Sequence, residues 1–254
     1  MKETGSTNKE VFKHGYNQIL NAIDRPQLKE FKGVFSSEDI TGDKQKIDRL
    51  KEQFEQSTFL NEQKKWASLF ESILCDEIEL GDWLGPEVMT SFTSEFDDIV
   101  HGVDGVIELN MSDTEFIHIG FDCTFSLDAL KKKLVKVANM IRTGNLAQIK
   151  YFTSPHTQER KSLESVPLVI LAVEKENIKE LADLSVTKQR QKLNEHPLKY
   201  VILEQLLFQL YTFRAYAFSQ RRSSMQRMFN QAIEIVTLNI QNFLLRNPIQ
   251  PKQY

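Results

Sequence analysis

The chain has 254 residues, 41% of them hydrophobic, which is enough to build a buried core. Its 32 basic and 35 acidic residues are interspersed and give a net charge of −3, so any surface that binds nucleic acid must be a local patch. No run approaches the roughly 20 apolar residues of a membrane-spanning helix, and Cys75 and Cys123 lack the CxxC spacing of a zinc site. These features favour a folded protein of the reducing cytoplasm, with no membrane segment and no disulfide framework.

The composition divides the chain into three regions. Residues 1–62 are polar and lysine-rich with scattered aromatic residues, which predicts a mostly helical N-terminal extension. Residues 63–185 combine helical and strand-like patterns and predict an α/β core. Residues 186–254 are helical in pattern and are expected to form a C-terminal helical region packed on that core.

The core begins with an amphipathic helix within residues 52–79. Trp66, Phe70, Ile73 and Glu77 recur at helical spacing, and the glycines and proline of GDWLGPE then end the helix. Strand-like runs follow, which are shorter and richer in β-branched and aromatic residues. They cover residues 96–101, 103–110, 115–125, 147–153 and 166–174.

A crossover helix is expected between the third and fourth of these strands. Within residues 127–143 one face is apolar, and Gly144 follows as a C-terminal stop; this face comprises Leu127, Leu130, Leu134, Val137, Ala138 and Ile141. A hairpin that leads into a helix and then into further strands implies an α/β fold with a mixed β-sheet sandwiched by helices.

The predicted hairpin, residues 103–125, carries an aspartate on each arm. A register that leaves the loop 111–115 places Asp104 opposite Asp122, with Cβ atoms about 4.5–5.5 Å apart. Like charges at this distance destabilise a hairpin, and a divalent cation such as Mg²⁺ would compensate them. The alternative is local: Asp104 followed by Gly105 is also typical of a tight turn, in which case the aspartate is only a turn residue.

Three stretches, FDD, GVDGVIE and FDCTF, precede a lysine-bearing helix in an order that resembles the PD-(D/E)XK nuclease superfamily. The chain is similar in particular to uncharacterised members with DDxxxGVD, DxT and IKYF stretches, and the resemblance covers roughly residues 66–174. It implies a restriction-endonuclease-like core, Mg²⁺ or Mn²⁺ as the cofactor, and hydrolysis of phosphodiester bonds of DNA.

The resemblance also implies a set of site residues. In that family a helix glutamate, a strand aspartate and an Asp/Glu-x-Lys motif on the next strand bind the metal and activate water. Asp104 corresponds to the first strand acid and Asp122 to the second, and the backbone carbonyl of Cys123 is a further metal ligand. Thr124 stands where the family usually has its lysine, and a threonine hydroxyl carries no charge to stabilise an oxyanion.

For two positions of this implied site, the lysine and the helix acid, the sequence offers two candidate residues each. Some family members take the lysine from an adjacent helix, and Lys131 and Lys133 flank the apolar face of the crossover helix; Lys133 is taken as the catalytic candidate. The helix acid is Glu71 or Glu77, and Glu71 lies at the distance before the hairpin that suits the family better. Each of these side chains is also consistent with an ordinary solvated surface residue.

The sequence leaves more than one function open. The first is a Mg²⁺-dependent nuclease acting on DNA, for which a homodimer is an option because many enzymes that cut both strands use two sites. The alternative is a catalytically inactive protein of the same fold that binds nucleic acid or another protein. A third is a scaffold that works through its C-terminal helices. There is no GxxxxGK[ST] loop, GxGxxG turn or GxSxG elbow, which disfavours nucleotide-driven motors, dinucleotide oxidoreductases and serine hydrolases.

Overall fold

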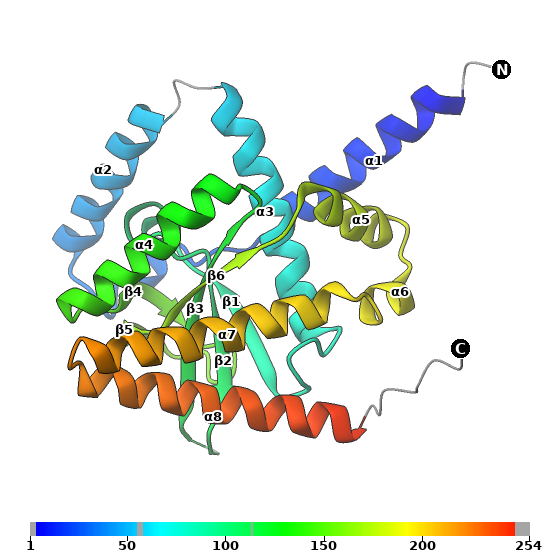
Figure 1. Cartoon of the computed structure of the whole chain (residues 1–254). Helices are drawn as coiled ribbons and strands as arrows, with labels where there is room; N and C mark the ends of the chain where they lie inside the picture. The colour runs from blue at the N-terminus through cyan, green and yellow to red at the C-terminus, as the bar shows by residue number, and fades with distance from the viewer. Residues whose placement is uncertain (1–3, 55–57, 113, 247–254) are drawn as a thin grey trace.

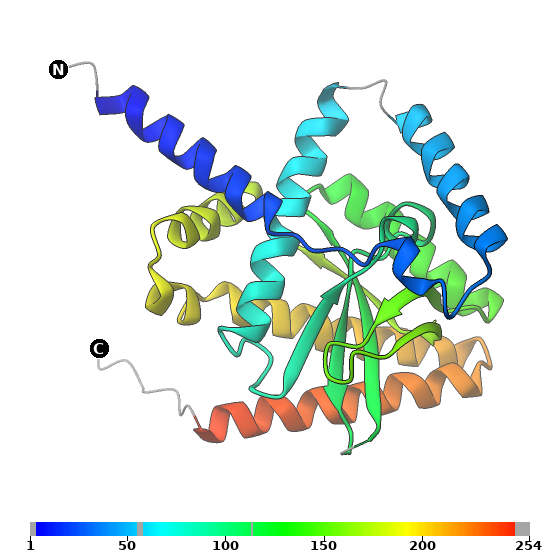
Figure 2. The same ribbon diagram turned by 180° about the vertical axis from the view of Figure 1, so that it is seen from behind.

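A mixed β-sheet forms the centre of the protein, with helices against both faces (Figures 1 and 2). The computed structural model describes residues 4–54, 58–112 and 114–246. The α-helices are α1 Thr4–Asn21, α2 Ser37–Phe54, α3 Thr58–Glu79, α4 Leu127–Thr143, α5 Lys175–Val186, α6 Arg190–Asn194, α7 Leu198–Ser219 and α8 Ser223–Arg246. The strands are β1 Val88–Phe92, β2 Gly105–Asn110, β3 Phe116–Thr124, β4 Ala147–Thr153, β5 Arg160–Val166 and β6 Leu168–Ala172. The predicted α/β class with a mixed sheet is confirmed.

The main sheet has the strand order β1-β2-β3-β6. The first three strands are antiparallel neighbours, and β6 pairs with β3 in parallel after the chain has passed through α4 and a separate two-stranded sheet, β4–β5. Val106 pairs with Gly120 and Glu108 with His118, which is the register expected for the hairpin. Asp104 therefore precedes a regular strand, and the interpretation of Asp104 as a tight-turn residue is wrong.

Parts of the strand prediction are wrong. Residues 96–101 are not a strand: Asp97–His101 form one turn of π-helix that ends at Gly102, whose φ of 64° lies in the left-handed region. A local hydrogen bond explains the difference, because the Ser94 hydroxyl accepts from the backbone N–H of Asp97 and starts a turn. Strands β1 and β5 were not predicted.

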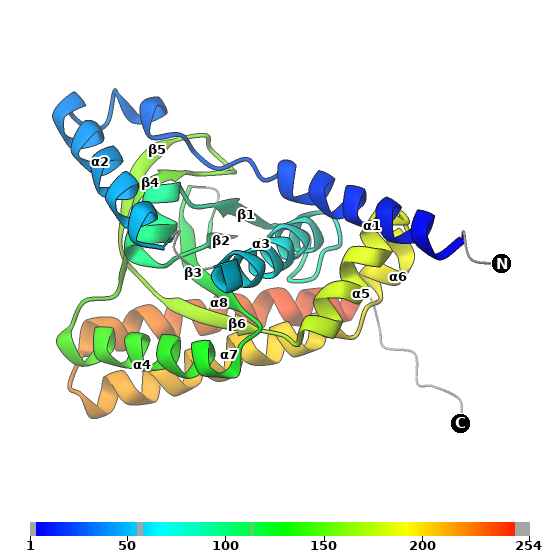
Figure 3. The ribbon, with the colours of Figure 1, turned by 90° about the horizontal axis from the view of Figure 1, so that it is seen from above.

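Helices α3 and α7–α8 cover opposite faces of the sheet. Helix α3 contacts β1 and β3, whereas α8 contacts β2 and β3, and α4 and α7 contact β6 (Figure 3). Ser126 caps the N-terminus of α4, and Gly144, with φ 89°, ends it as predicted. After β6 the described chain contains helices and no further strand, in agreement with the expectation for the C-terminal third.

Helix α7 also covers the open edge of β6. The Gln209 side chain accepts from the backbone N–H of Ile170 at 2.9 Å and donates to its carbonyl at 2.8 Å, and Gln205 makes the same pair of bonds with Ala172. Two side-chain amides thus replace a neighbouring strand, which satisfies backbone groups that an edge strand would otherwise expose.

A second, smaller hydrophobic cluster joins the N-terminal region to β4. Phe31, Ile47, Phe96 and Tyr151 are buried together, and the rings of Phe31 and Tyr151 meet edge to face with centroids 5.2 Å apart. None of the described helices is long and apolar enough to cross a membrane.

Candidate active site

Asp104 and Asp122 lie next to each other at the end of the β2–β3 hairpin. The register that pairs Gly105 with Phe121 places Asp104 opposite Asp122, and only 6% and 5% of these two aspartates is exposed. The Asp104 carboxylate accepts from the backbone N–H of Cys123 at 2.6 Å. The hairpin therefore fixes two buried acids side by side, as the sequence predicted.

The two carboxylates are electrostatically unfavourable to each other. The pKa of Asp104 is raised to about 7, first by burial and second by the negative charge of Asp122. Burial also raises the pKa of Asp122, against the lowering influence of Lys133. Because the two acids titrate together, the pair as a whole resists holding two negative charges near neutral pH unless a cation is present.

Lys133 is the cation nearest to this pair. Its ammonium group forms an ion pair with Asp122 and donates to the carbonyl oxygen of Cys123 at 2.8 Å. Burial lowers the pKa of Lys133, but Asp122 and Asp104 outweigh it and raise the pKa above its ordinary value. Lys131 is exposed, so of the two lysines considered from the sequence it is Lys133 that reaches the aspartates.

Thr124 has a structural role in this arrangement. Its hydroxyl accepts from the backbone N–H of Ser126 at 3.3 Å, and Ser126 in turn caps α4. Thr124 therefore helps to start the helix that presents Lys133.

Glu71 belongs to the same cluster, whereas Glu77 does not. Glu71, on α3, is only 4% exposed, and burial followed by the charge of Asp104 raises its pKa well above the ordinary value. Glu77 is also buried, but it pairs at 2.6 Å with Arg190, the first residue of α6. Neither glutamate is a surface carboxylate, and Glu71 is the one whose charge couples to the strand aspartates.

Arg25, which the sequence did not single out, holds Glu71 in place. The Arg25 guanidinium donates to Glu71 at 2.8 Å and to the carbonyl oxygens of Thr93 and Asp104 at 3.1 and 3.5 Å. It also lies 3.5 Å from the carboxylate of Asp98. No local pattern marks this arginine, because it stands in the polar segment between α1 and the next turn and reaches the site only in the folded chain.

The neighbouring acids Asp97 and Asp98 have different roles. Asp97 is fully buried and accepts from the backbone N–H groups of Lys150 and Tyr151 at 2.7 and 3.0 Å, so it fastens the π-helical turn to β4. Asp98 faces the cluster: burial raises its pKa to about 6, with a further contribution from Asp104. Asp97 is thus a structural acid, and Asp98 is a fourth acid of the cluster.

The donor chemistry of the hairpin end suits a hard divalent cation. Asp104, Asp122 and the carbonyl of Cys123 are oxygen donors on adjacent strands, and Mg²⁺ is typically held by one or two carboxylates together with water and phosphate oxygens. Among the described residues, no three His, Cys, Asp or Glu side chains converge on one point. The residues therefore fit an ion held by two aspartates, whereas the Glu71 carboxylate is bonded to Arg25.

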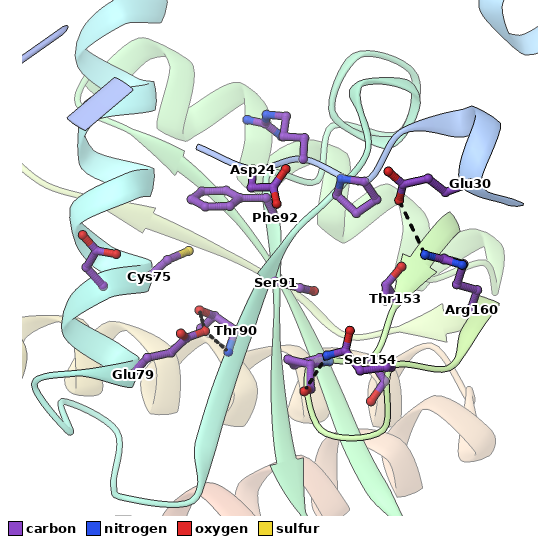
Figure 4. A pocket seen from close by; sticks show the side chains of 15 residues that line it. Asp24, Glu30, Cys75, Glu79, Thr90, Ser91, Phe92, Thr153, Ser154 and Arg160 are labelled. Carbon is purple, nitrogen blue, oxygen red and sulfur yellow. Dashed lines mark hydrogen bonds and ion pairs between the residues drawn. The ribbon is translucent and has the colours of Figure 1, made fainter. Parts of the chain in front are cut away.

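Arg25 also lines a cavity of about 380 Å³ (Figure 4). It lies between the C-terminal half of α3, β1 and the turn between β4 and β5. Its charged residues are four acids and two arginines, namely Asp24, Glu30, Asp76, Glu79, Arg25 and Arg160. Because acids predominate, this cavity is poorly suited to a polyanion such as a nucleic-acid strand.

No protein-family model, no curated protein and no solved structure matches the chain. The geometry of the Asp104–Asp122–Lys133 cluster is thus the basis on which a function can be assigned.

Proposed function

We propose that this protein is a Mg²⁺-dependent nuclease-like protein that hydrolyses phosphodiester bonds of DNA. The observation that carries the proposal is the arrangement of Asp104 and Asp122 on paired strands, with Lys133 reaching them from the following helix. The order of elements supports a restriction-endonuclease-like core: α3 is followed by β1, β2 and β3, then by the crossover helix α4, and β6 pairs in parallel with β3.

The proposal gives each residue a distinct role. Asp104, Asp122 and the Cys123 carbonyl would hold Mg²⁺ or Mn²⁺. Glu71 would become a further ligand if its ion pair with Arg25 were replaced by a bond to the ion. When bound, such an ion polarises the phosphate and lowers the pKa of a coordinated water.

The lysine and the arginine supply fixed positive charge. Lys133, whose pKa is raised, stays protonated and would steady negative charge on the phosphate. Arg25 holds the Glu71 carboxylate close to the strand end that carries Asp104, and Glu71 would become available to the ion only when this ion pair breaks.

One observation favours a second function, a catalytically inactive module of this fold that binds nucleic acid or protein. Lys133 neutralises Asp122 and Arg25 neutralises Glu71, so two of the acids are already satisfied by side chains of the chain itself. With Thr124 occupied at the start of α4, such a cluster would stabilise the hairpin end without any metal.

The two functions differ in metal binding and cleavage. We would titrate Mn²⁺ and Mg²⁺ into the protein by calorimetry and assay single- and double-stranded DNA for cleavage, using the parent, Asp122→Asn and Lys133→Met. Lys132→Met is the matched control, because Lys132 is exposed on the same helix. The nuclease proposal expects metal binding lost in Asp122→Asn, and cleavage lost in both variants and kept in the control. A parent that binds no metal even with DNA present would refute it and favour the inactive module.

A further inference from the structure

Helix α7 has an outer face that is apolar and uncovered. Val201, Phe208, Tyr211 and Phe218 are 42%, 72%, 43% and 69% exposed, and the Arg214 guanidinium of the same helix lies over the Tyr211 ring. The inner face of the same helix is fully used, because its leucines are buried and Gln209 is bonded to β6. Single exposed apolar residues are common, but four aligned along one helix mark an interaction surface.

The exposed positions follow a coiled-coil spacing. Six of the exposed positions of α7 recur in alternating steps of three and four residues: Val201, Glu204, Phe208, Tyr211, Ala215 and Phe218. A spacing that averages 3.5 residues keeps a straight seam along a helix and is the pattern by which one helix packs lengthwise against another. We call these six positions the α7 seam.

We propose that the α7 seam is the interface of a homodimer, in which two copies of α7 pack antiparallel about a twofold axis between Phe208 and Tyr211. In this alignment Phe208 meets the partner's Tyr211, and Val201 meets the partner's Phe218. Four of the five apolar residues of the seam are placed symmetrically about its centre, so Val201, Phe208, Tyr211 and Phe218 each find an apolar side chain opposite. Self-complementarity of this kind is what an isologous twofold contact requires.

The charges on the helix favour a second copy in the antiparallel direction. Glu204 is the one acidic residue of the α7 seam, and the antiparallel alignment places it against the partner's Ala215, next to the partner's Arg214. A parallel pairing in register would instead place Glu204 against the partner's Glu204, and Arg214 beside its own equivalent. Like charges at such positions are destabilising, so the sequence of the seam selects one orientation.

The location of the seam permits such contact. Helix α7 lies with α8 on the outside of the molecule, on the side of the sheet away from α1 and α2 (Figure 3). A second copy can therefore approach along α7 without displacing the N-terminal helices. The inference is independent of the proposed nuclease function, since none of the six seam residues belongs to the acid cluster.

Sedimentation equilibrium of the full chain tests the proposal. We expect a dimer in the parent, and Phe208→Glu should raise its dissociation constant at least about tenfold, as for a central hot spot. Because Phe208 is largely exposed in the single chain, the variant and the parent should melt at the same temperature when both are diluted to the monomeric state. Leu80→Glu, at a position 68% exposed just after α3, is the matched control and should remain dimeric. A parent that is monomeric at all concentrations, or a dimer unaffected by Phe208→Glu, would overturn the proposal.

Cross-linking tests the orientation. The native cysteines, Cys75 and Cys123, are buried, so a short bismaleimide should report introduced thiols only. Antiparallel packing predicts that Val201→Cys and Phe218→Cys proteins form a covalent dimer when mixed and that neither does so alone. Self-cross-linking of each variant would show a parallel pair, and no cross-link in the mixture would exclude the seam as the contact.

Discussion

The Arg25 guanidinium lies 2.8 Å from the Glu71 carboxylate and also donates to backbone carbonyls beside the π-helical turn and the hairpin. A single side chain from the segment after α1 thus connects α3 to the strand end that carries Asp104. Its charge also lowers the pKa of Glu71 and of Asp98, two acids whose pKa burial raises.

Replacing Arg25 should therefore destabilise the fold. Arg25→Met leaves Glu71 buried without its cation, and we expect the free energy of unfolding at pH 7 to fall by about 2 kcal/mol, measured by urea denaturation. Adding Glu71→Gln should recover part of that loss, because the uncompensated charge is removed. Lys51→Met is the control: its pair with Glu95 is exposed, and the expected change is at most about 0.5 kcal/mol. Equal losses in both variants would contradict a special role for Arg25.

Asp104 should make stability depend on pH when metal is absent. Its folded-state pKa of about 7 lies above the ordinary value of 3.8, so the folded protein holds this proton more tightly than the unfolded chain. The contribution of Asp104 to stability is therefore greatest below about pH 4 and is lost as pH rises through 7.

The Asp104→Asn variant isolates this contribution. It should melt at a higher temperature than the parent at pH 8 in EDTA and at a similar temperature near pH 4, as followed by circular dichroism. Asp128→Asn, in the first turn of α4, serves as the control. A variant less stable than the parent at pH 8 would show that Asp104 is held in a favourable, fully ionised state.

The sequence predicted the parts of the site that depend on regular periodicity. The alternation along 103–125 fixed which residues of the hairpin face each other, and the 3.6-residue repeat of α4 brought Lys133 to the side of the sheet. Both follow from spacing along one or two adjacent elements, so they could be foreseen without the rest of the chain.

The remaining parts depend on contacts between distant segments. Arg25 reaches Glu71 across 46 positions of the sequence, and Asp97 is bonded to β4 more than 50 positions later. The predicted strand at 96–101 failed for a local reason, the bond from the backbone N–H of Asp97 to the Ser94 hydroxyl, which outweighs the β-branched residues that follow. Neither kind of contact leaves a periodic trace in the sequence.

Glu108 should be a determinant of acid stability. It is fully buried and bonded to His118, His156 and Ser154, which joins the hairpin to the turn between β4 and β5. Burial alone would raise the pKa of Glu108, but these hydrogen bonds bring it down to about 2. Its contribution is therefore present above about pH 4.5 and is lost as pH falls through 2.

Glu108→Gln should lower the free energy of unfolding at pH 7 by about 2 kcal/mol, because one buried acceptor becomes an amide donor facing other donors. The difference from the parent should shrink as pH falls toward 2, when measured by urea denaturation at a series of pH values. Glu159→Gln, in an exposed pair with Lys161, is the control and should change little. A difference that stays constant down to pH 2 would mean that the charge of Glu108 is not what stabilises the turn.

Gln209 and Phe208 are adjacent in sequence but should act on different equilibria. Gln209 faces inward and bonds both backbone groups of Ile170, so Gln209→Leu leaves a buried donor and acceptor unpaired, and we expect a loss of about 2 kcal/mol in the free energy of unfolding. Hydrogen exchange at the Ile170 amide should accelerate in the same variant, while Gln231→Leu, at an exposed position of α8, should change neither quantity. Phe208 faces outward, so Phe208→Glu should weaken association and leave the Ile170 amide protected. Rapid exchange at Ile170 in both variants would mean that the two faces of α7 are not independent.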